Sequence, residues 1–150
     1  MAKLMDQLHN HPYAVSNTTQ EIKFNLLAMH SNMKEAILAT SDDDLSAAMA
    51  RVNAHEEKVF LGFDLLSERF LGEKHDLNEA YRLVIQWQPI REYVIGLVER
   101  GEHEEAIRVS KNTGAEFLNN LLLQIQTLND FANQKAQEFH QEVITDRQNA

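Results

Sequence analysis

The sequence predicts an all-α fold, an up-down-up-down antiparallel four-helix bundle with long first and fourth helices. Apolar residues recur with a seven-residue period along the chain, as they do on the inward face of a bundle helix. The 150 residues include only five Gly and two Pro, too few to punctuate the short strands of a β-sandwich or barrel. Residues that end one helix and begin the next cluster near positions 41, 74 and 101. Such short connections make neighbouring helices antiparallel.

The first helix is expected over residues 1–40, where the inward positions keep one frame. One series is Leu8, Val15, Ile22, Met29 and Ala36, and the other is Met5, Pro12, Thr19, Leu26, Met33 and Thr40. Pro12 removes a backbone donor and restricts the residue before it. Two alternatives stay open there: a start signal for the folded helix, or a kink near the membrane that acts as a hinge.

The second helix is expected to begin after Ser41, whose hydroxyl can cap it, while the carboxylates of Asp42, Asp43 and Asp44 suit its positive end. Gly72 is expected to end it, because glycine readily takes the left-handed conformation found after helices. The inward positions are Leu45, Met49, Val52, Glu56, Val59, Phe63, Leu66 and Phe70.

The third helix is expected between a cap at Asp76 and a stop at Gly101. Pro89 lies in its middle and predicts a kink, since proline cannot donate a backbone hydrogen bond. The inward positions are Ala80, Val84, Trp87, Arg91, Val94 and Val98.

The fourth helix is expected to start with the acidic residues Glu102, Glu104 and Glu105. It continues toward Ala150, because no helix-breaking residue follows Gly114. The inward positions are Leu118, Leu121, Ile125, Leu128, Ala132 and Phe139.

The four predicted helices differ in length, at about 40, 30, 25 and 45 residues. The first and fourth helices should therefore project together past the turn near residue 74. This arrangement fits a module inserted between two membrane-spanning helices better than a compact cytosolic bundle. We treat residues 1–150 as a single domain, either a complete cytosolic protein or a piece of a larger one.

Composition excludes several classes of function. The net charge of −9 argues against nucleic acid as a partner, because an acidic surface repels phosphate. The chain has no Cys, which removes disulfides, Cys-ligated zinc, iron–sulfur clusters and a thiol nucleophile. No run of 18 apolar residues suggests a membrane span, and the first residues do not resemble a signal peptide.

No catalytic or cofactor-binding motif is recognisable. The seven histidines do not form the His-x-x-x-His or paired Glu-x-x-His patterns of di-iron bundles, so neither a metal nor any other cofactor is expected. These histidines are His9, His11, His30, His55, His75, His103 and His140. Phosphate-binding glycine loops and serine-nucleophile motifs are absent from the sequence as well. We therefore expect a protein that is not an enzyme.

Two stretches of the first helix resemble a known family. They are Leu8-His9-Asn10-His11-Pro12-Tyr13-Ala14-Val15-Ser16-Asn17 and Met29-His30-Ser31-Asn32-Met33-Lys34-Glu35. Both are similar to the extracytoplasmic four-helix-bundle ligand-binding domains of methyl-accepting chemotaxis proteins and of related sensor histidine kinases and diguanylate cyclases.

The resemblance implies a periplasmic sensor domain of an inner-membrane receptor, a homodimer in that receptor, with a membrane-spanning helix on either side. Such receptors bind amino acids through arginines on the first helix. Here that helix carries only Lys3, Lys23 and Lys34 as basic residues, so no ligand-binding residue is transferred from the family.

Inward polar residues provide a candidate site from the sequence itself. Glu56 and Arg91 lie nearly equally far from the turn near residue 74, so they should share one layer of the bundle. The fourth helix brings Lys111, Asn112 and Thr113 to that height, and the first helix brings Asn25 and Leu26.

Two interpretations of this layer stay open. Glu56 and Arg91 can form a structural ion pair that fixes the register of the bundle. Alternatively, Arg91, Glu56, Lys111, Thr113 and Asn25 can line a pocket in which the guanidinium binds an anion.

Our first functional hypothesis is an extracytoplasmic sensory domain of a bacterial transmembrane chemoreceptor. Its partner would be a small-molecule ligand, such as an anion, or a periplasmic binding protein, and the signal would pass by helix displacement. The second is a cytosolic interaction or adaptor protein without a ligand, and the third a bundle enzyme or metal carrier. Apolar residues outside the core frame of the first helix suggest a homodimer contact: Tyr13, Phe24, Leu27 and Leu38.

Overall fold

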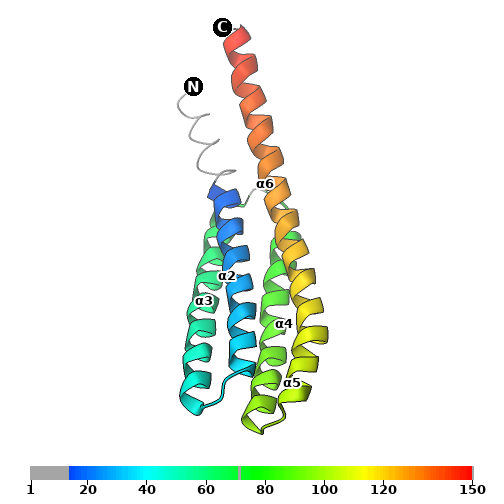
Figure 1. Ribbon diagram of the computed structural model, residues 1–150. Coiled ribbons are helices and arrows are strands. Elements are labelled where there is room, and N and C mark those ends of the chain that lie inside the picture. The colour runs from blue at the N-terminus through cyan, green and yellow to red at the C-terminus, as the bar shows by residue number, and fades with distance from the viewer. Residues whose placement is uncertain (1–13, 71, 150) are drawn as a thin grey trace.

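The protein is an all-α four-helix bundle in the computed structural model, which describes residues 14–70 and 72–149 (Figure 1). No strand occurs among these residues, so the predicted fold class is confirmed. The elements are α2 (Ala14–Ile37), α3 (Asp42–Arg69), α4 (Lys74–Glu99), α5 (His103–Val109), the π-helix η2 (Ser110–Gly114) and α6 (Ala115–Asn149). The last three follow one another without a break and form the fourth helix of the bundle.

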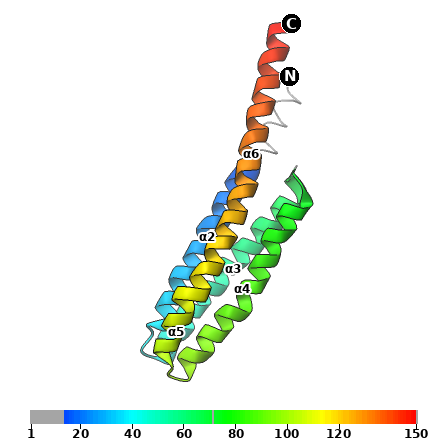
Figure 2. The same ribbon diagram turned by 90° about the vertical axis from the view of Figure 1, so that its right-hand side faces the viewer.

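The turns after α2 and after α4 lie together at one end of the bundle, which we call the turn end (Figure 1). At the other end α6 continues well beyond the connection between α3 and α4, as both views show (Figure 2). The predicted projection of the fourth helix is therefore confirmed. The matching prediction for the first ten residues, and the kink or start at Pro12, lie outside the described residues.

The helix boundaries follow most of the predicted signals. The Ser41 hydroxyl accepts a hydrogen bond from the backbone N–H of Asp44 at 3.1 Å, so the predicted cap of α3 is confirmed. Gly101 has a φ of 77°, the left-handed conformation that favours glycine after a helix.

Two predicted boundaries are wrong by a few residues. α3 ends at Arg69 and its C-cap is Phe70 in an extended conformation, so Gly72 lies beyond the helix. α4 begins at Lys74, and Asp76 lies inside the first turn rather than at the cap. Its carboxylate still suits the positive helix end, which is why both positions give a similar sequence signal.

The helix α4 continues through Pro89 from Lys74 to Glu99. The proline side chain lies on the exposed side of the helix. Its missing hydrogen bond therefore leaves a carbonyl that water can reach, and proline does not end the helix here.

The core contains most of the predicted inward series and adds residues outside it, among them Ile37, Leu77 and Leu97, whereas the predicted inward residue Thr40 is exposed. α2 and α3 pack closely, and a Cβ added to Gly62 of α3 would lie 2.5 Å from Cγ1 of Ile22 of α2. α3 and α4 lie farther apart, and large side chains fill the space between them. Tyr81 of α4 makes edge-to-face contacts with Phe60 and Phe63 of α3, at centroid distances of 6.0 and 5.5 Å.

Candidate functional site

Glu56 of α3 and Arg91 of α4 form an ion pair, so the predicted shared layer is confirmed for these two residues. The Arg91 side chain is only 5% exposed, whereas the Glu56 side chain is 18% exposed. The guanidinium carbon of Arg91 also lies 4.9 Å from the centroid of the Trp87 ring, a cation–π distance. A buried guanidinium is thus paired on one side and stacked on the other.

Arg91 also faces a small cavity of about 10 Å³. Its other lining residues are His30, Met33, Trp87, Ile90, Val94, Ser110 and Gly114. A cavity of this size holds at most about one water molecule. Arg91 Nε is buried beside it and has no hydrogen-bond partner among the described residues. The geometry therefore favours the structural ion pair over a pocket for an organic ligand at this layer.

The structure does not bring the other predicted site residues to the ion pair. Lys111 and Thr113 lie in η2 with exposed side chains, while the neighbouring Ser110 and Gly114 are buried. The prediction that this polar stretch lines the interior is therefore wrong for Lys111 and Thr113, because the π-helical turn points other residues inward.

Asn25 lies beside the residue that precedes Glu56 on α3, close to the expected height, but its hydrogen bonds go to residues outside the ion pair. Its side-chain oxygen is 2.8 Å from Nδ1 of His55, and its amide nitrogen donates to the Glu21 carbonyl. The α2 residues beside Arg91 are instead His30 and Met33. Long side chains explain the difference, since Arg91 and Glu56 can meet without having their backbones at equal height.

A larger opening lies near the turn end, between α2 and the start of the fourth helix, with a volume of about 330 Å³. We call it the cationic groove. α2 contributes His30, Lys34 and Ile37, the turn after it contributes Leu38, and the fourth helix contributes Ile107, Ser110, Lys111 and Ala115. His30 and Ser110 line both this groove and the Arg91 cavity, so the two spaces are neighbours.

The titratable side chains that line the groove are all basic, although the chain as a whole carries a net charge of −9. They are His30, Lys34 and Lys111. Burial, with a smaller contribution from the Lys34 charge, lowers the pKa of His30 from its usual value. The remaining walls are largely aliphatic. The groove thus combines an apolar lining with a local excess of positive charge.

Sequence reasoning identified Lys111 but missed His30 and Lys34 as its neighbours. A signal was present, because His30, Lys34 and Leu38 recur at intervals of four residues and therefore lie on one face of a helix. The sequence does not reveal which residues of the fourth helix face them across the groove, because that depends on the π-helical geometry of η2.

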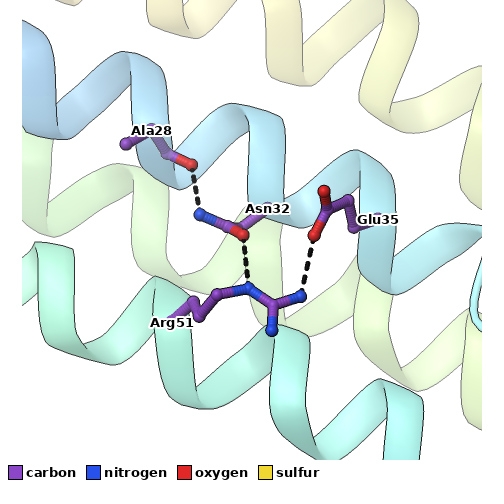
Figure 3. Close-up of polar contacts among 4 residues, drawn as sticks. All are labelled: Ala28, Asn32, Glu35 and Arg51. Carbon is purple, nitrogen blue, oxygen red and sulfur yellow. Dashed lines mark hydrogen bonds and ion pairs between the residues drawn. The ribbon is translucent and has the colours of Figure 1, made fainter.

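The side of α2 that faces α3 carries a different polar cluster, drawn in Figure 3. Arg51 of α3 donates from Nε to Asn32 Oδ1 at 2.8 Å and from Nη2 to Glu35 Oε2 at 2.7 Å. Asn32 in turn donates to the Ala28 carbonyl at 2.8 Å (Figure 3). These side chains are largely exposed, so the cluster aligns α2 with α3 and adds little stability.

α2 also bonds to α6 through buried polar side chains. Asn129 Oδ1 accepts hydrogen bonds from the hydroxyls of Ser16 and Thr19, both at 2.9 Å. Asn129 and Thr19 are buried, so these bonds are made away from water and fix the relative position of the two helices.

The described residues contain neither a cluster suited to a metal ion nor a helix suited to a membrane. Within residues 14–70 and 72–149, no group of three or more His, Asp or Glu side chains is placed to hold a metal ion. In the same part of the chain, no helix has the length and hydropathy needed to cross a membrane.

The ion pair predicts an asymmetric response to mutation. Glu56→Leu should lower the free energy of unfolding by about 3–5 kcal/mol, because it leaves Arg91 buried without a counter-charge. Arg91→Met should cost less, since the more exposed Glu56 carboxylate can turn toward water. The double variant should recover most of the loss. Urea denaturation of the four proteins measures this.

The exposed pair of Arg51 and Glu35 provides the matched control. Arg51→Met and Glu35→Leu should each change the free energy of unfolding by less than about 1 kcal/mol. A double Glu56/Arg91 variant as unstable as the Glu56→Leu protein would contradict the structural role of the pair.

His30 predicts a pH dependence of stability. Because its pKa is lower in the folded than in the unfolded chain, the unfolded chain binds more protons below about pH 6.5. The contribution of His30 is therefore fully present above that pH and is lost as the pH falls through the folded-state pKa.

The difference in unfolding free energy between wild type and His30→Gln should accordingly shrink from pH 7.5 to pH 5. Lys34→Met should weaken this trend without removing it, because burial is the larger cause. Urea titrations across this pH range measure the difference, and a difference that grows toward pH 5 would show the opposite sign of the shift.

The family of the chain follows from its whole length. A family model described as a four-helix-bundle sensory module for signal transduction matches residues 1–145. No curated protein and no solved structure gives a match. The family description agrees with the observed bundle and with the resemblance of the first helix to chemoreceptor domains. The chain therefore belongs to the four-helix-bundle sensory modules for signal transduction.

Proposed function

We propose that the chain is the extracytoplasmic sensory domain of a transmembrane chemoreceptor, and that it binds a small organic anion in the cationic groove. Membership of a sensory family supplies the role in signal transduction. The observation that carries the proposal is the groove itself, where three basic side chains surround an aliphatic cleft on an acidic protein.

Size and chemistry restrict the ligand class. A volume of about 330 Å³ suits a small molecule, at the lower end of the range for ligand sites. Ile37, Leu38 and Ile107 favour an apolar body, while Lys34 and Lys111 favour a negative charge at one end. A monocarboxylate with a short aliphatic or aromatic body meets both requirements, and Lys111 keeps the ligand-binding role proposed for it from the sequence.

The remaining predicted site residues receive supporting roles in this proposal. Arg91 and Glu56 hold the helices behind the groove rather than contacting the ligand. Asn25 holds His55, and Thr113 faces solvent on the outer side of η2.

We further propose that the domain forms a homodimer through α2. Phe24, Leu27 and Leu38 are 66%, 46% and 71% exposed and form an apolar strip along α2 and the turn that follows it, while Tyr13 lies outside the described residues. Leu38 belongs to this strip and to the cationic groove. A second copy packed on the strip by two-fold symmetry would therefore also border the groove.

The projecting end of α6 supports the membrane arrangement. In the proposal, α6 continues toward a membrane-spanning helix of an inner-membrane protein, and the bundle lies in the periplasm as a single domain. The cationic groove is near the opposite, turn end, where a ligand or a periplasmic binding protein would approach from the periplasm (Figure 1).

Ligand binding can be tested with hexanoate, which has one carboxylate and an aliphatic body. Calorimetry should detect hexanoate binding, but not hexanol, which lacks the charge, or acetate, which lacks the body. Lys34→Met and Lys111→Met should each weaken hexanoate binding roughly two- to five-fold, the range expected for an exposed charge pair.

Lys58 of α3 is an exposed lysine that does not line the groove, so Lys58→Met serves as the control and should bind hexanoate like the wild type. Equal binding of hexanol and hexanoate, or no effect of the Lys34 and Lys111 variants, would overturn the proposed anion site.

The location of the domain can be tested in the full-length protein that contains this chain. This chain has no Cys, so single cysteines introduced at the exposed positions Ser46 and Glu68 can report on it. We expect a membrane-impermeant maleimide to label both in intact cells, with the unsubstituted protein as background. Labelling only after lysis would contradict an extracytoplasmic domain.

A further inference from the structure

The fourth helix carries one residue more than a regular bundle helix needs. From Leu118 to Ala132 one series of buried positions alternates in steps of three and four residues, whereas its continuation back across η2 advances in steps of four, with Val109 and Asn129 buried beside the series. The series is Ala106, Ser110, Gly114, Leu118, Leu121, Ile125, Leu128 and Ala132. Removing one residue between Ser110 and Gly114 would make the spacing 4-3-4-3 throughout, the seven-residue repeat of a bundle.

The π-helix η2 accommodates the inserted residue. Each step of four residues in an α-helix overshoots a full turn by about 40°, so three steps in a row would rotate the buried face away from the core. The wider π turn absorbs the excess. The backbone N–H of Ala115 donates to the Ser110 carbonyl five residues earlier, while Val109 and Ala115 on either side keep α-helical angles.

The segment is also weakly held. Its sequence, Ser-Lys-Asn-Thr-Gly, contains four residues of low helix propensity. On its inner side lie the 10 Å³ cavity and the Arg91 Nε without a hydrogen-bond partner among the described residues. Packing behind η2 is therefore incomplete.

The segments before and after η2 are hydrogen-bonded to opposite ends of α2. Beyond it, α6 is fixed to α2 by the hydrogen bonds of Ser16 and Thr19 to Asn129. Before it, the seven-residue helix α5 packs into the core through Ala106 and Val109, and the hydrogen bond that links it to α2 lies at its first residue, where His103 Nδ1 is 3.1 Å from the Ile37 carbonyl oxygen. The cationic groove spans this division, since Ile107 precedes η2, Lys111 belongs to it and Ala115 follows it.

We propose that η2 is a conformational joint: the inserted residue lets α5 and η2 turn relative to α6, so that occupancy of the cationic groove and the packing around Arg91 are coupled. The coupling rests on the proposed ligand function; the joint itself does not. A ligand that touches residues on both sides of η2 must bind its alternative arrangements with different affinity, which is the condition for shifting their populations.

Two deletions test the joint without any ligand. Deleting Asn112, an exposed residue of η2, should leave the buried face intact and give a melting temperature equal to or above that of the wild type. Deleting Asn120, an equally exposed residue of α6, should shift every buried position after it and lower the melting temperature steeply. Equal destabilisation by the two deletions would overturn the joint.

Hydrogen exchange provides a second measurement on the wild type. Amides of residues 110–114 should exchange at least ten-fold faster than those of residues 118–128 in the same helix. Equal protection of both segments would also overturn the joint.

The coupling is tested with hexanoate, and the sole tryptophan, Trp87, reports on it because it lines the Arg91 cavity. Hexanoate should change Trp87 fluorescence and slow exchange at residues 110–114, and deletion of Asn112 should weaken its binding at least three-fold. If hexanoate binds the wild type and the Asn112 deletion equally, the coupling is overturned and the proposed ligand site in the groove stands.

If hexanoate does not bind the wild type, the proposed ligand and the coupling are overturned together. The deletion and exchange results then still decide whether η2 is a joint.

Discussion

Burial of one guanidinium, that of Arg91, constrains much of this bundle. A charge in the core is costly unless it is paired, and here Glu56 neutralises it from the neighbouring helix while Trp87 stacks against it. The long side chains of this ion pair need more room between α3 and α4 than aliphatic side chains would. The aromatic contacts of Tyr81 with Phe60 and Phe63 fill the same interval closer to the projecting end.

That constraint divides the bundle into a tight side and a looser side. On the tight side, Gly62 lets α3 approach Ile22 of α2, and the Arg51 cluster aligns the two helices along their surface (Figure 3). On the looser side, Arg91 meets η2 across a small cavity rather than a filled layer. α2 is held by its contacts with α3. A structural change in the cationic groove would therefore move the opposite wall of the groove, which α5 and η2 form.

The sequence predicted the parts of the fold that depend on local chemistry and on the seven-residue period. The Ser41 cap and the Gly101 stop depend on residues next to them, and within each helix the predicted inward positions recur every seven residues. Glu56 and Arg91 could be paired because an antiparallel turn relates positions equally far from it.

The candidate site was harder to predict, for two physical reasons. The five residues of η2 rotate Lys111 and Thr113 outward, and an insertion of one residue is visible only when the buried positions on both sides are known. The groove also joins residues from opposite ends of the sequence, His30 and Lys111, whose approach depends on helix packing rather than on spacing. Asn25 illustrates the same limit, because it lies beside the residue before Glu56 and yet bonds to His55 rather than to the ion pair.

In the proposed joint, the insertion lets the fourth helix combine two functions. Its first part forms a groove wall that can move, and α6 stays fixed to α2. A helix with a continuous seven-residue repeat moves as one body, so a change at the groove would have to displace all of α6 and break the buried bonds between Asn129 and α2. The inserted turn separates the two segments, because α5 and η2 can rearrange at the groove while α6 keeps its core contacts. In the proposed joint, what reaches the projecting end of α6 depends on how much the Arg91 layer repacks, since Ser110 and Gly114 of η2 line the cavity beside Arg91.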